Sequence, residues 1–223
     1  SGRMKFELSH HKSLSFPFAF EIVDDAEAAL VKGLPRWPLF SAPMPKVLFL
    51  CGPSGATRRY VERYQAVFES VLGARCMTAV VARASLAQAR EIDAACASTG
   101  ADAIVAVGGG TVIDVAKMVV RLRRTPLMVV PSALSSDGIA SPISVLANED
   151  GKRMSLASGI PSCLFVDLDL VREAPRHLTL AGVGDVLSNV SALLDLAEFE
   201  HLYEEPVDGF AKVLSKIGRA SCR

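Results

Sequence analysis

Three segments of this 223-residue chain combine residue types that can bind phosphate, hydroxyl groups or a metal ion. The first is the glycine run Gly108–Gly110, which is followed by Thr111 and a helical pattern. Glycines let a backbone approach a ligand closely, and the free N–H groups at a helix start suit a phosphate. The sequence therefore indicates a phosphate-binding turn.

A purely structural interpretation of this turn is also open. Thr111 can cap the helix with Asp114 as its capping-box partner, and this role is compatible with phosphate binding. The pattern is neither G-x-G-x-x-G nor a P-loop, which ends in G-K-[ST]. It also follows the third predicted strand and not the first, so a standard Rossmann dehydrogenase is a poor match.

The second segment is a serine-rich loop that runs from Ser132 to Pro142 and contains Asp137. It follows a predicted strand, and ligands of open α/β sheets bind beyond the carboxyl ends of the strands. Its hydroxyls can bond a nicotinamide amide, a ribose or a polyol, but Ser, Asp and Gly are also common in capped turns. The third segment holds Asp185 among small residues; in isolation, it is most simply a solvated helix residue.

Short apolar runs alternate with helical patterns between Lys46 and about Val166, which predicts an α/β fold with a parallel sheet covered on both faces. Ser85 is expected to cap one helix and Gly100 to end it. The predicted strands are Lys46–Cys51, Thr78–Ala82, Ala103–Val107, Leu127–Val130 and Leu164–Asp167, and the predicted helices are Thr57–Val71, Ser85–Ser98 and Val112–Arg121.

The pattern changes beyond the fourth strand. Ile143–Leu146 and Met154–Leu156 flank Asn148–Gly151, which predicts a β-hairpin insertion. From Leu178 onward the apolar spacing is helical only. We therefore expect a nucleotide-binding α/β domain over residues 1–175 and the first helices of an incomplete all-α domain over residues 176–216. Residues 217–223 resemble a translated sequencing adapter and are expected to be a non-native tail.

Composition narrows the function classes. The formal net charge is zero, which argues against nucleic acid as a partner. No apolar run approaches the roughly 20 residues that span a bilayer, so membrane insertion is not expected. Ser1–Arg3 suggests a cloning remnant. The five scattered cysteines form no C-x-x-C pair, which favours packing roles and a cytoplasmic location.

Taken together, GGGTVIDVAK, PSALSSDGIASP and APRHLTLAGVGDVLSN resemble the glycerol-1-phosphate dehydrogenase family, within the superfamily of iron-type alcohol dehydrogenases, glycerol dehydrogenase and dehydroquinate synthase. The resemblance covers about Lys46 to Lys216. It implies a dehydroquinate synthase-like fold and hydride transfer between NAD or NADP and a polyol phosphate. The substrate pair would be dihydroxyacetone phosphate and sn-glycerol 1-phosphate, with a catalytic zinc and a role in phospholipid biosynthesis.

The resemblance also implies residue roles. Asp137 and Asp185 would be the catalytic residues: Asp137 would bind substrate, and Asp185 would be the first zinc ligand. Ser132, Ser135 and Ser141 would contact the nicotinamide half; Ser132 replaces the family's usual threonine and keeps the hydroxyl. The cofactor-binding turn would comprise Gly108, Gly109, Gly110, Thr111, Val112 and Asp114.

The resemblance also leaves gaps. The family takes two further zinc ligands from histidines later in the sequence, and His10, His11, His177 and His201 match no such motif. We therefore expect a C-terminally truncated chain that binds nucleotide, lacks full activity and can form a homo-oligomer through exposed helix faces.

Two other functions remain open: a dehydroquinate- or inosose-synthase-like cyclase, and a metal-free nucleotide-binding module. The cyclases typically have glutamate where this chain has Asp185, and a pure binding module needs neither Asp137 nor Asp185. The choice between NAD and NADP is also open. Arg58, Arg59 and Arg83 are candidates for binding a 2′-phosphate.

Overall fold

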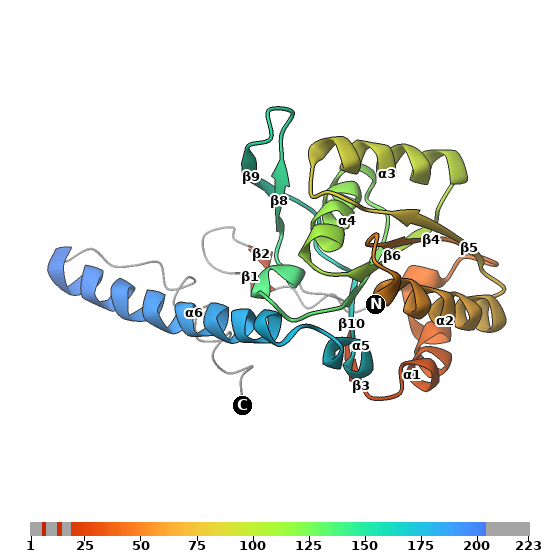
Figure 1. The fold of residues 1–223 in the computed structure, drawn as a ribbon, viewed down its shortest axis with the longest axis horizontal. Coiled ribbons are helices and arrows are strands. Elements are labelled where there is room, and N and C mark those ends of the chain that lie inside the picture. Colours follow the sequence, from red (N-terminus) through yellow and green to blue (C-terminus); the bar gives the residue numbers. More distant parts are fainter. Residues whose placement is uncertain (1–5, 8–12, 15–18, 204–223) are drawn as a thin grey trace.

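The computed structural model describes residues 6–7, 13–14 and 19–203, and its centre is a six-stranded parallel sheet (Figure 1). The strand order is β3-β10-β7-β6-β4-β5. The strands are β3 (Ala19–Val23), β4 (Lys46–Cys51), β5 (Arg75–Val80), β6 (Ala103–Gly108), β7 (Leu127–Pro131) and β10 (Cys163–Asp167). The predicted α/β class is confirmed, and β3 is an additional edge strand that was not predicted.

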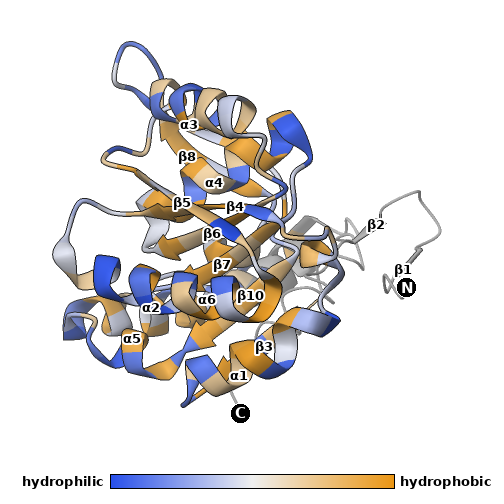
Figure 2. Ribbon diagram, turned by 90° about the vertical axis from the view of Figure 1, so that its right-hand side faces the viewer, coloured by the Kyte–Doolittle hydropathy of each residue, from blue (hydrophilic) through white to orange (hydrophobic). Residues whose placement is uncertain are grey.

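Alternating side chains of the inner strands bury both faces of this sheet. On β4, Val47, Phe49 and Cys51 belong to one core cluster, whereas Leu48 and Leu50 belong to the other. Such two-sided burial requires apolar residues at every position, which is why these strands are continuous hydrophobic runs. Figure 2 shows the resulting layers, with hydrophobic strands between two sets of helices.

The helices divide between the two faces. Residues of α1, α2 and α5 join the first cluster, and residues of α3 and α4 join the second. The helices are α1 (Ala26–Gly33), α2 (Gly55–Leu72), α3 (Leu86–Thr99), α4 (Gly110–Arg123), α5 (Leu168–Arg172) and α6 (Arg176–Tyr203), and the short 3-10 helices are η1 (Leu34–Arg36), η2 (Pro38–Phe40) and η3 (Asp137–Ala140). The pattern after Leu178 forms one long helix, α6, which extends away from the body in Figure 1.

The two capping residues predicted for α3 are confirmed. The Ser85 hydroxyl accepts a hydrogen bond from the N–H of Gln88, and Gly100 ends the helix in the left-handed conformation with φ of 65°. Both features were predicted, and both follow from ordinary capping chemistry.

The predicted hairpin is present and stands apart from the main sheet. It consists of the antiparallel strands β8 (Ile143–Ala147) and β9 (Arg153–Ala157). Gly151 adopts a φ of 78°, a left-handed conformation that favours glycine in the turn. A second antiparallel pair joins β1 (Phe6–Glu7) to β2 (Ser13–Leu14).

The described cysteines have packing roles, as predicted. Cys51, Cys96 and Cys163 are buried in the core, and Cys76 packs partly buried against it. Burial raises the pKa of Cys96 to about 11 and that of Cys163 to about 12, so both remain protonated at neutral pH.

Several expectations fall on the parts of the chain that the structure does not describe. They concern Ser1–Arg3, His10 and His11, Cys222 and the tail at residues 217–223. Among the described helices, none has the length and apolar character needed to cross a membrane.

Candidate functional site

The glycine turn and the serine-rich loop lie side by side at the carboxyl edge of the sheet. They leave the adjacent parallel strands β6 and β7, whose last residues, Gly108 and Pro131, are partners in register. The N–H of Ser132 donates to the carbonyl oxygen of Gly108 at 3.0 Å, which joins the first residue of the loop to the turn. The two predicted ligand-binding segments therefore share one edge, where ligands of open α/β sheets bind.

The start of α4 is uncapped. Its N-cap residue is Gly109 in extended conformation, and no side chain accepts a hydrogen bond from the first turn. The predicted Thr111–Asp114 capping box is therefore wrong, because the helix begins before Thr111. The N–H of Val112 donates to the carbonyl oxygen of Gly109 at 3.0 Å. The N–H groups of Gly110 and Thr111, at the first two helical positions, have no intrahelical acceptor.

The three glycines have different surroundings. A Cβ on Gly108 would lie 2.7 Å from Cγ2 of Val112, so close packing of helix on strand requires glycine there. A Cβ on Gly109 would lie 3.9 Å from the Ser132 hydroxyl oxygen. Gly110 is exposed, and a Cβ there would meet nothing within 4 Å. The turn is thus tightly packed toward the sheet and open on its outer side.

The serine-rich loop folds largely onto itself. Ser136 caps η3 by accepting a hydrogen bond from the N–H of Gly138 at 3.3 Å. The Ser141 hydroxyl is placed to donate to two carbonyl oxygens, that of Gly138 at 3.0 Å and that of Ile143 at 3.2 Å. Ser132 and Ser135 are half-buried. Of the three serines expected to contact a cofactor, Ser141 therefore also stabilises its own loop.

Asp137 and Asp185, which are 48 residues apart in the sequence, meet in the structure. The Asp137 N–H donates to Oδ2 of Asp185 at 2.7 Å. One helical turn further along α6, Nδ2 of Asn189 donates to Oδ2 of Asp137 at 3.1 Å. Helix α6 thus holds Asp137 by its backbone and by its carboxylate. Asn189 was not singled out from the sequence, since a helical asparagine carries no distinctive pattern.

Gly182 allows α6 to approach the serine-rich loop. A Cβ at this position would overlap the carbonyl oxygen of Leu134, whereas one on Gly184 would meet nothing within 4 Å. Gly182, Asp185 and Asn189 are spaced by three and four residues and so lie on one face of the helix. We call these three residues the loop-facing stripe.

Lys117 and Asp114 anchor the other side of the loop. The Lys117 side chain is fully buried, and its Nζ donates to the carbonyl oxygens of Gly138, at 2.7 Å, and Ile143. Oδ2 of Asp114 accepts a hydrogen bond from the N–H of Val145 at 3.1 Å, and its Oδ1 lies 3.4 Å from Nζ of Lys117. Asp114, predicted as a cofactor-binding residue, is thus bonded toward the hairpin.

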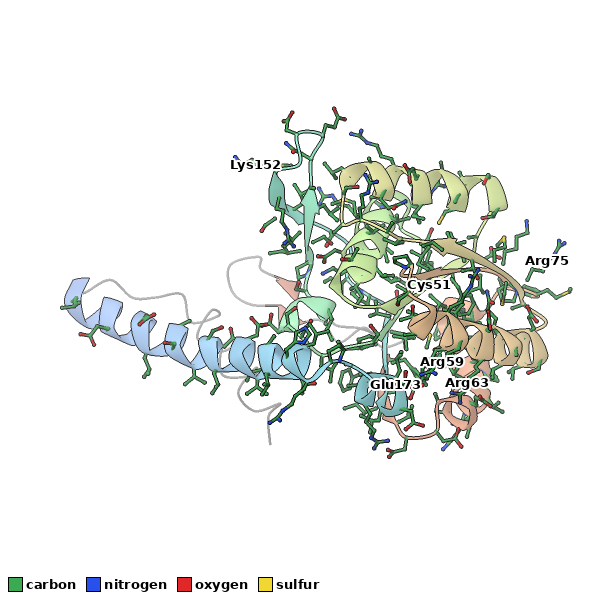
Figure 3. All side chains as sticks on the ribbon, in the orientation of Figure 1. Cys51, Arg59, Arg63, Arg75, Lys152 and Glu173 are labelled. Atoms are coloured by element: carbon green, nitrogen blue, oxygen red, sulfur yellow. The ribbon has the colours of Figure 1, made fainter. Side chains whose placement is uncertain are left out.

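One of the arginines considered for a 2′-phosphate is paired within the protein. The guanidinium of Arg59, on α2, forms an ion pair with Glu173, as Figure 3 shows. The Tyr60 hydroxyl donates to the same carboxylate at 2.8 Å. Hydrogen bonds from Arg59 and Tyr60 hold the pKa of Glu173 below its usual value. The interpretation of Arg59 as a 2′-phosphate ligand is therefore disfavoured.

A catalytic zinc commonly takes three protein ligands. Among the described residues, no group of three or more His, Cys, Asp or Glu side chains is arranged to hold a metal ion. His177 is exposed, and the side chain of His201 lies outside the described part. The described residues thus do not by themselves fit a zinc site.

A family model described as iron-containing alcohol dehydrogenase matches residues 46–175, which include the sheet edge, the glycine turn and the serine-rich loop. The chain belongs to this family. The part of the resemblance that lies between Lys46 and Pro175 is thereby confirmed.

Curated relatives carry a more specific name. The chain is 39% identical over 118 residues to the glycerol-1-phosphate dehydrogenase [NAD(P)+] of Methanosphaera stadtmanae, which covers 53% of this chain and 34% of the relative. It is 40% identical over 118 residues to the enzyme of the same name from Pyrobaculum neutrophilum, covering 52% and 34%. The chain thus matches about a third of the length of these relatives.

Solved structures share the fold. An archaeal halo-thermophilic alcohol dehydrogenase from a Red Sea brine pool superposes with a TM-score of 0.68 at 18% identity, covering 86% of this chain and 53% of that one. A 2-deoxy-scyllo-inosose synthase superposes with a TM-score of 0.64 at 20% identity, covering 78% and 50%. The expected fold, shared by iron-type alcohol dehydrogenases and dehydroquinate synthase-like enzymes, is confirmed.

Proposed function

We propose that this chain is the nucleotide-binding part of an NAD(P)-dependent sn-glycerol-1-phosphate dehydrogenase. The reaction is reversible hydride transfer between NAD(P)H and dihydroxyacetone phosphate. The observation that carries the proposal is the uncapped start of α4 at the open, carboxyl edge of the sheet. Its free N–H groups and the positive end of its helix dipole suit a pyrophosphate.

The neighbouring segments suit the rest of a dinucleotide. Ser132 lies against the glycine turn, Ser135 follows it along the loop toward Asp137, and Ser141 lies beyond Asp137. In this proposal the turn holds the pyrophosphate, and the serine-rich loop holds the nicotinamide half. The ring is thereby directed toward the meeting point of Asp137 and Asp185, where the polyol phosphate binds.

The roles of the two carboxylates follow from that meeting point. Asp137 accepts a substrate hydroxyl. Asp185 would be one ligand of a zinc beside the substrate, together with ligands that the described residues do not supply. A bound zinc would act as a Lewis acid on the reacting oxygen. Among the described residues, the Asp137 N–H fixes the Asp185 carboxylate, and Asn189 orients the Asp137 carboxylate.

The competing functions have weaker support. The likeness to 2-deoxy-scyllo-inosose synthase is at 20% identity and concerns the fold alone, whereas the curated relatives at 39% and 40% identity are named as dehydrogenases. A metal-free binding module does not require a separate helix that holds Asp137 by both its N–H and its carboxylate. The contact between Asp137 and Asp185 therefore favours an enzyme. On this proposal the protein acts on a small molecule in the cytoplasm.

Gly110→Asp tests the phosphate-binding turn. A Cβ at this open position meets nothing within 4 Å, and a carboxylate at a helix start is compatible with folding. The same charge repels a pyrophosphate, so we expect the dissociation constants for ADP and NADH to rise at least about tenfold. Both are measured by isothermal titration calorimetry on the purified chain.

Gly110→Ala is the matched control, because it fills the same space without a charge. We expect its affinity for ADP to stay within about twofold of the unmodified chain, a difference well below 1.4 kcal/mol. Equal affinities of the Asp and Ala variants would contradict the proposed pyrophosphate site. Titration with NADPH in parallel decides between the two nicotinamide cofactors.

A further inference from the structure

Lys117 is a cation enclosed by protein oxygens. Its side chain is fully buried, and three partners surround Nζ: the carbonyl oxygens of Gly138 and Ile143, and Oδ1 of Asp114. An ammonium has three hydrogens to donate, and a buried charge is tolerated only when it is paired. Burial lowers the pKa of Lys117, and Asp114 opposes this shift.

The position of Lys117 excludes a direct role in phosphate binding. In a P-loop, the lysine beside the glycines extends its amine to the nucleotide phosphates. Here the amine is buried and is directed toward the backbone of the serine-rich loop. Lys117 therefore contacts the loop and not the face of the turn that is open to a ligand.

Side chains of α4 hold a continuous segment that runs from the serine-rich loop into the hairpin. Lys117 binds the carbonyl oxygens of Gly138 and Ile143, and Asp114 binds the N–H of Val145. The Ser141 hydroxyl bonds the same two carbonyl oxygens as Lys117 does. The segment from Gly138 to Val145 is thus fixed from the helix side at three backbone positions.

The same helix begins at the glycine turn. Gly110 is its first residue, and Lys117 lies two turns further along. One rigid element therefore carries both the uncapped N–H groups at its start and the side chains that hold the loop after Asp137.

We infer that Lys117 and Asp114 are positioning residues that set the spacing between the pyrophosphate turn and the loop facing the nicotinamide. This inference rests on the proposed function, because it takes the turn and the loop as two halves of one dinucleotide site. It predicts that the two halves respond differently to mutation. ADP needs only the turn, whereas NADH needs the turn and the loop in register.

Lys117→Met tests this prediction, because methionine keeps an apolar chain of similar length and removes the ammonium. We expect the dissociation constant for NADH to rise about tenfold or more, while that for ADP stays within about twofold. Lys152→Met is the matched control, since this exposed lysine lies at the hairpin turn, away from the site (Figure 3). It should change neither constant.

Asp114→Asn is the second variant, in case Lys117→Met does not fold. Asparagine has the same shape and keeps an oxygen for the N–H of Val145 but removes the charge beside Lys117. We expect a smaller loss, about threefold for NADH, again without a change for ADP. Circular dichroism spectra establish that each variant is folded.

The outcomes separate the two proposals. If the unmodified chain binds neither ADP nor NADH, the proposed function fails. If it binds both, but a folded variant loses affinity for both equally or for neither, the positioning role is overturned. A loss confined to NADH in a folded variant supports it.

Discussion

Glu173 is the residue through which α2 holds the segment that leads into α6. It lies just after α5, two residues before Pro175, and its carboxylate receives hydrogen bonds from Arg59 and Tyr60. On the far side of Pro175, α6 carries Asp185 to Asp137. A single exposed carboxylate thus contributes to where the site-bearing helix begins.

The lowered pKa of Glu173 gives this contact a pH dependence. A carboxyl whose pKa is lower in the folded state stabilises the fold above its unfolded value, ordinarily 4.5, and loses that effect as the pH falls through the lower value. We therefore expect Glu173→Gln to lower the free energy of unfolding at pH 7, and this difference to shrink below about pH 4.5.

Urea titrations of both proteins at pH 7 and at low pH measure the effect. Glu149→Gln is the control, because Glu149 forms an exposed ion pair with Arg90 at 3.2 Å on the hairpin. Exposed pairs contribute little, whereas Glu173 also accepts a part-buried hydrogen bond from the Tyr60 hydroxyl, so only the Glu149 variant should be close to neutral. A difference for Glu173→Gln that does not vary with pH would contradict the assigned role.

At the same scale, the sequence predicted residue types better than residue partners. It singled out Asp137, Asp185 and the glycine turn, since acidic residues and glycines stand out in an apolar chain. It did not predict that Asn189 holds Asp137, nor that Lys117 holds the loop. Those contacts join residues 21 to 52 positions apart, which local spacing cannot reveal.

Helix α6 has two opposite sides with different chemistry. With 100° per residue, the loop-facing stripe of Gly182, Asp185 and Asn189 covers one side of the helix. The apolar residues Leu180, Val183, Leu187 and Leu194 lie on the other side, and each of them is exposed. We call this second set the apolar stripe.

Gly182→Ala tests how closely the loop-facing stripe must approach the loop. The added Cβ overlaps the carbonyl oxygen of Leu134, so the helix or the loop must move. Overpacking of this kind costs about 1–3 kcal/mol. We expect a lower melting temperature and faster hydrogen exchange at the Asp137 N–H, which would lose its bond to Asp185.

Gly184→Ala is the control, because it makes the same substitution two residues away in open space. Alanine is the better helix former, so this variant should gain about 0.5–1 kcal/mol. If both variants have the same stability, the close approach at Gly182 is not required.

At the scale of elements, prediction succeeded where periodicity was strong. The buried strands β4, β6, β7 and β10 are short apolar runs and were all predicted within one residue or so. The edge strand β3 was missed, because its exposed residues follow neither alternation nor a continuous apolar run. The N-cap of α4 was predicted two residues late, because a glycine N-cap leaves no polar side chain to recognise.

For the whole molecule, the apolar stripe is surface that the described residues leave uncovered. Leu187 and Leu194 are 62% and 68% exposed, and an exposed apolar face of this kind favours association with another apolar surface. We expect the chain to self-associate, with a weight-average mass in sedimentation experiments that rises with concentration. Leu187→Glu should raise the dissociation constant of this self-association by about tenfold or more.

Leu122→Glu is the matched control for this prediction. Leu122 lies on α4 and is 56% exposed, but it does not belong to the apolar stripe. Its variant should associate like the unmodified chain. Equal association of the Leu187→Glu variant would mean that α6 does not mediate contacts between copies.

The pairing of β3 with β10 has a consequence for the order of assembly. Ala19 pairs with Cys163, so β3 cannot pair with β10 until more than 140 further residues have been added to the chain. At a synthesis rate of about 5–20 residues per second, this interval is roughly 7–30 s. Until β10 is made, the exposed Phe20 and Ile22 of β3 lack their strand partner, and so does the open edge of β7 once Leu127–Pro131 has been synthesised. Insertion of β10 is thus the last step in closing the sheet, and the nascent chain is most prone to aggregation just before it.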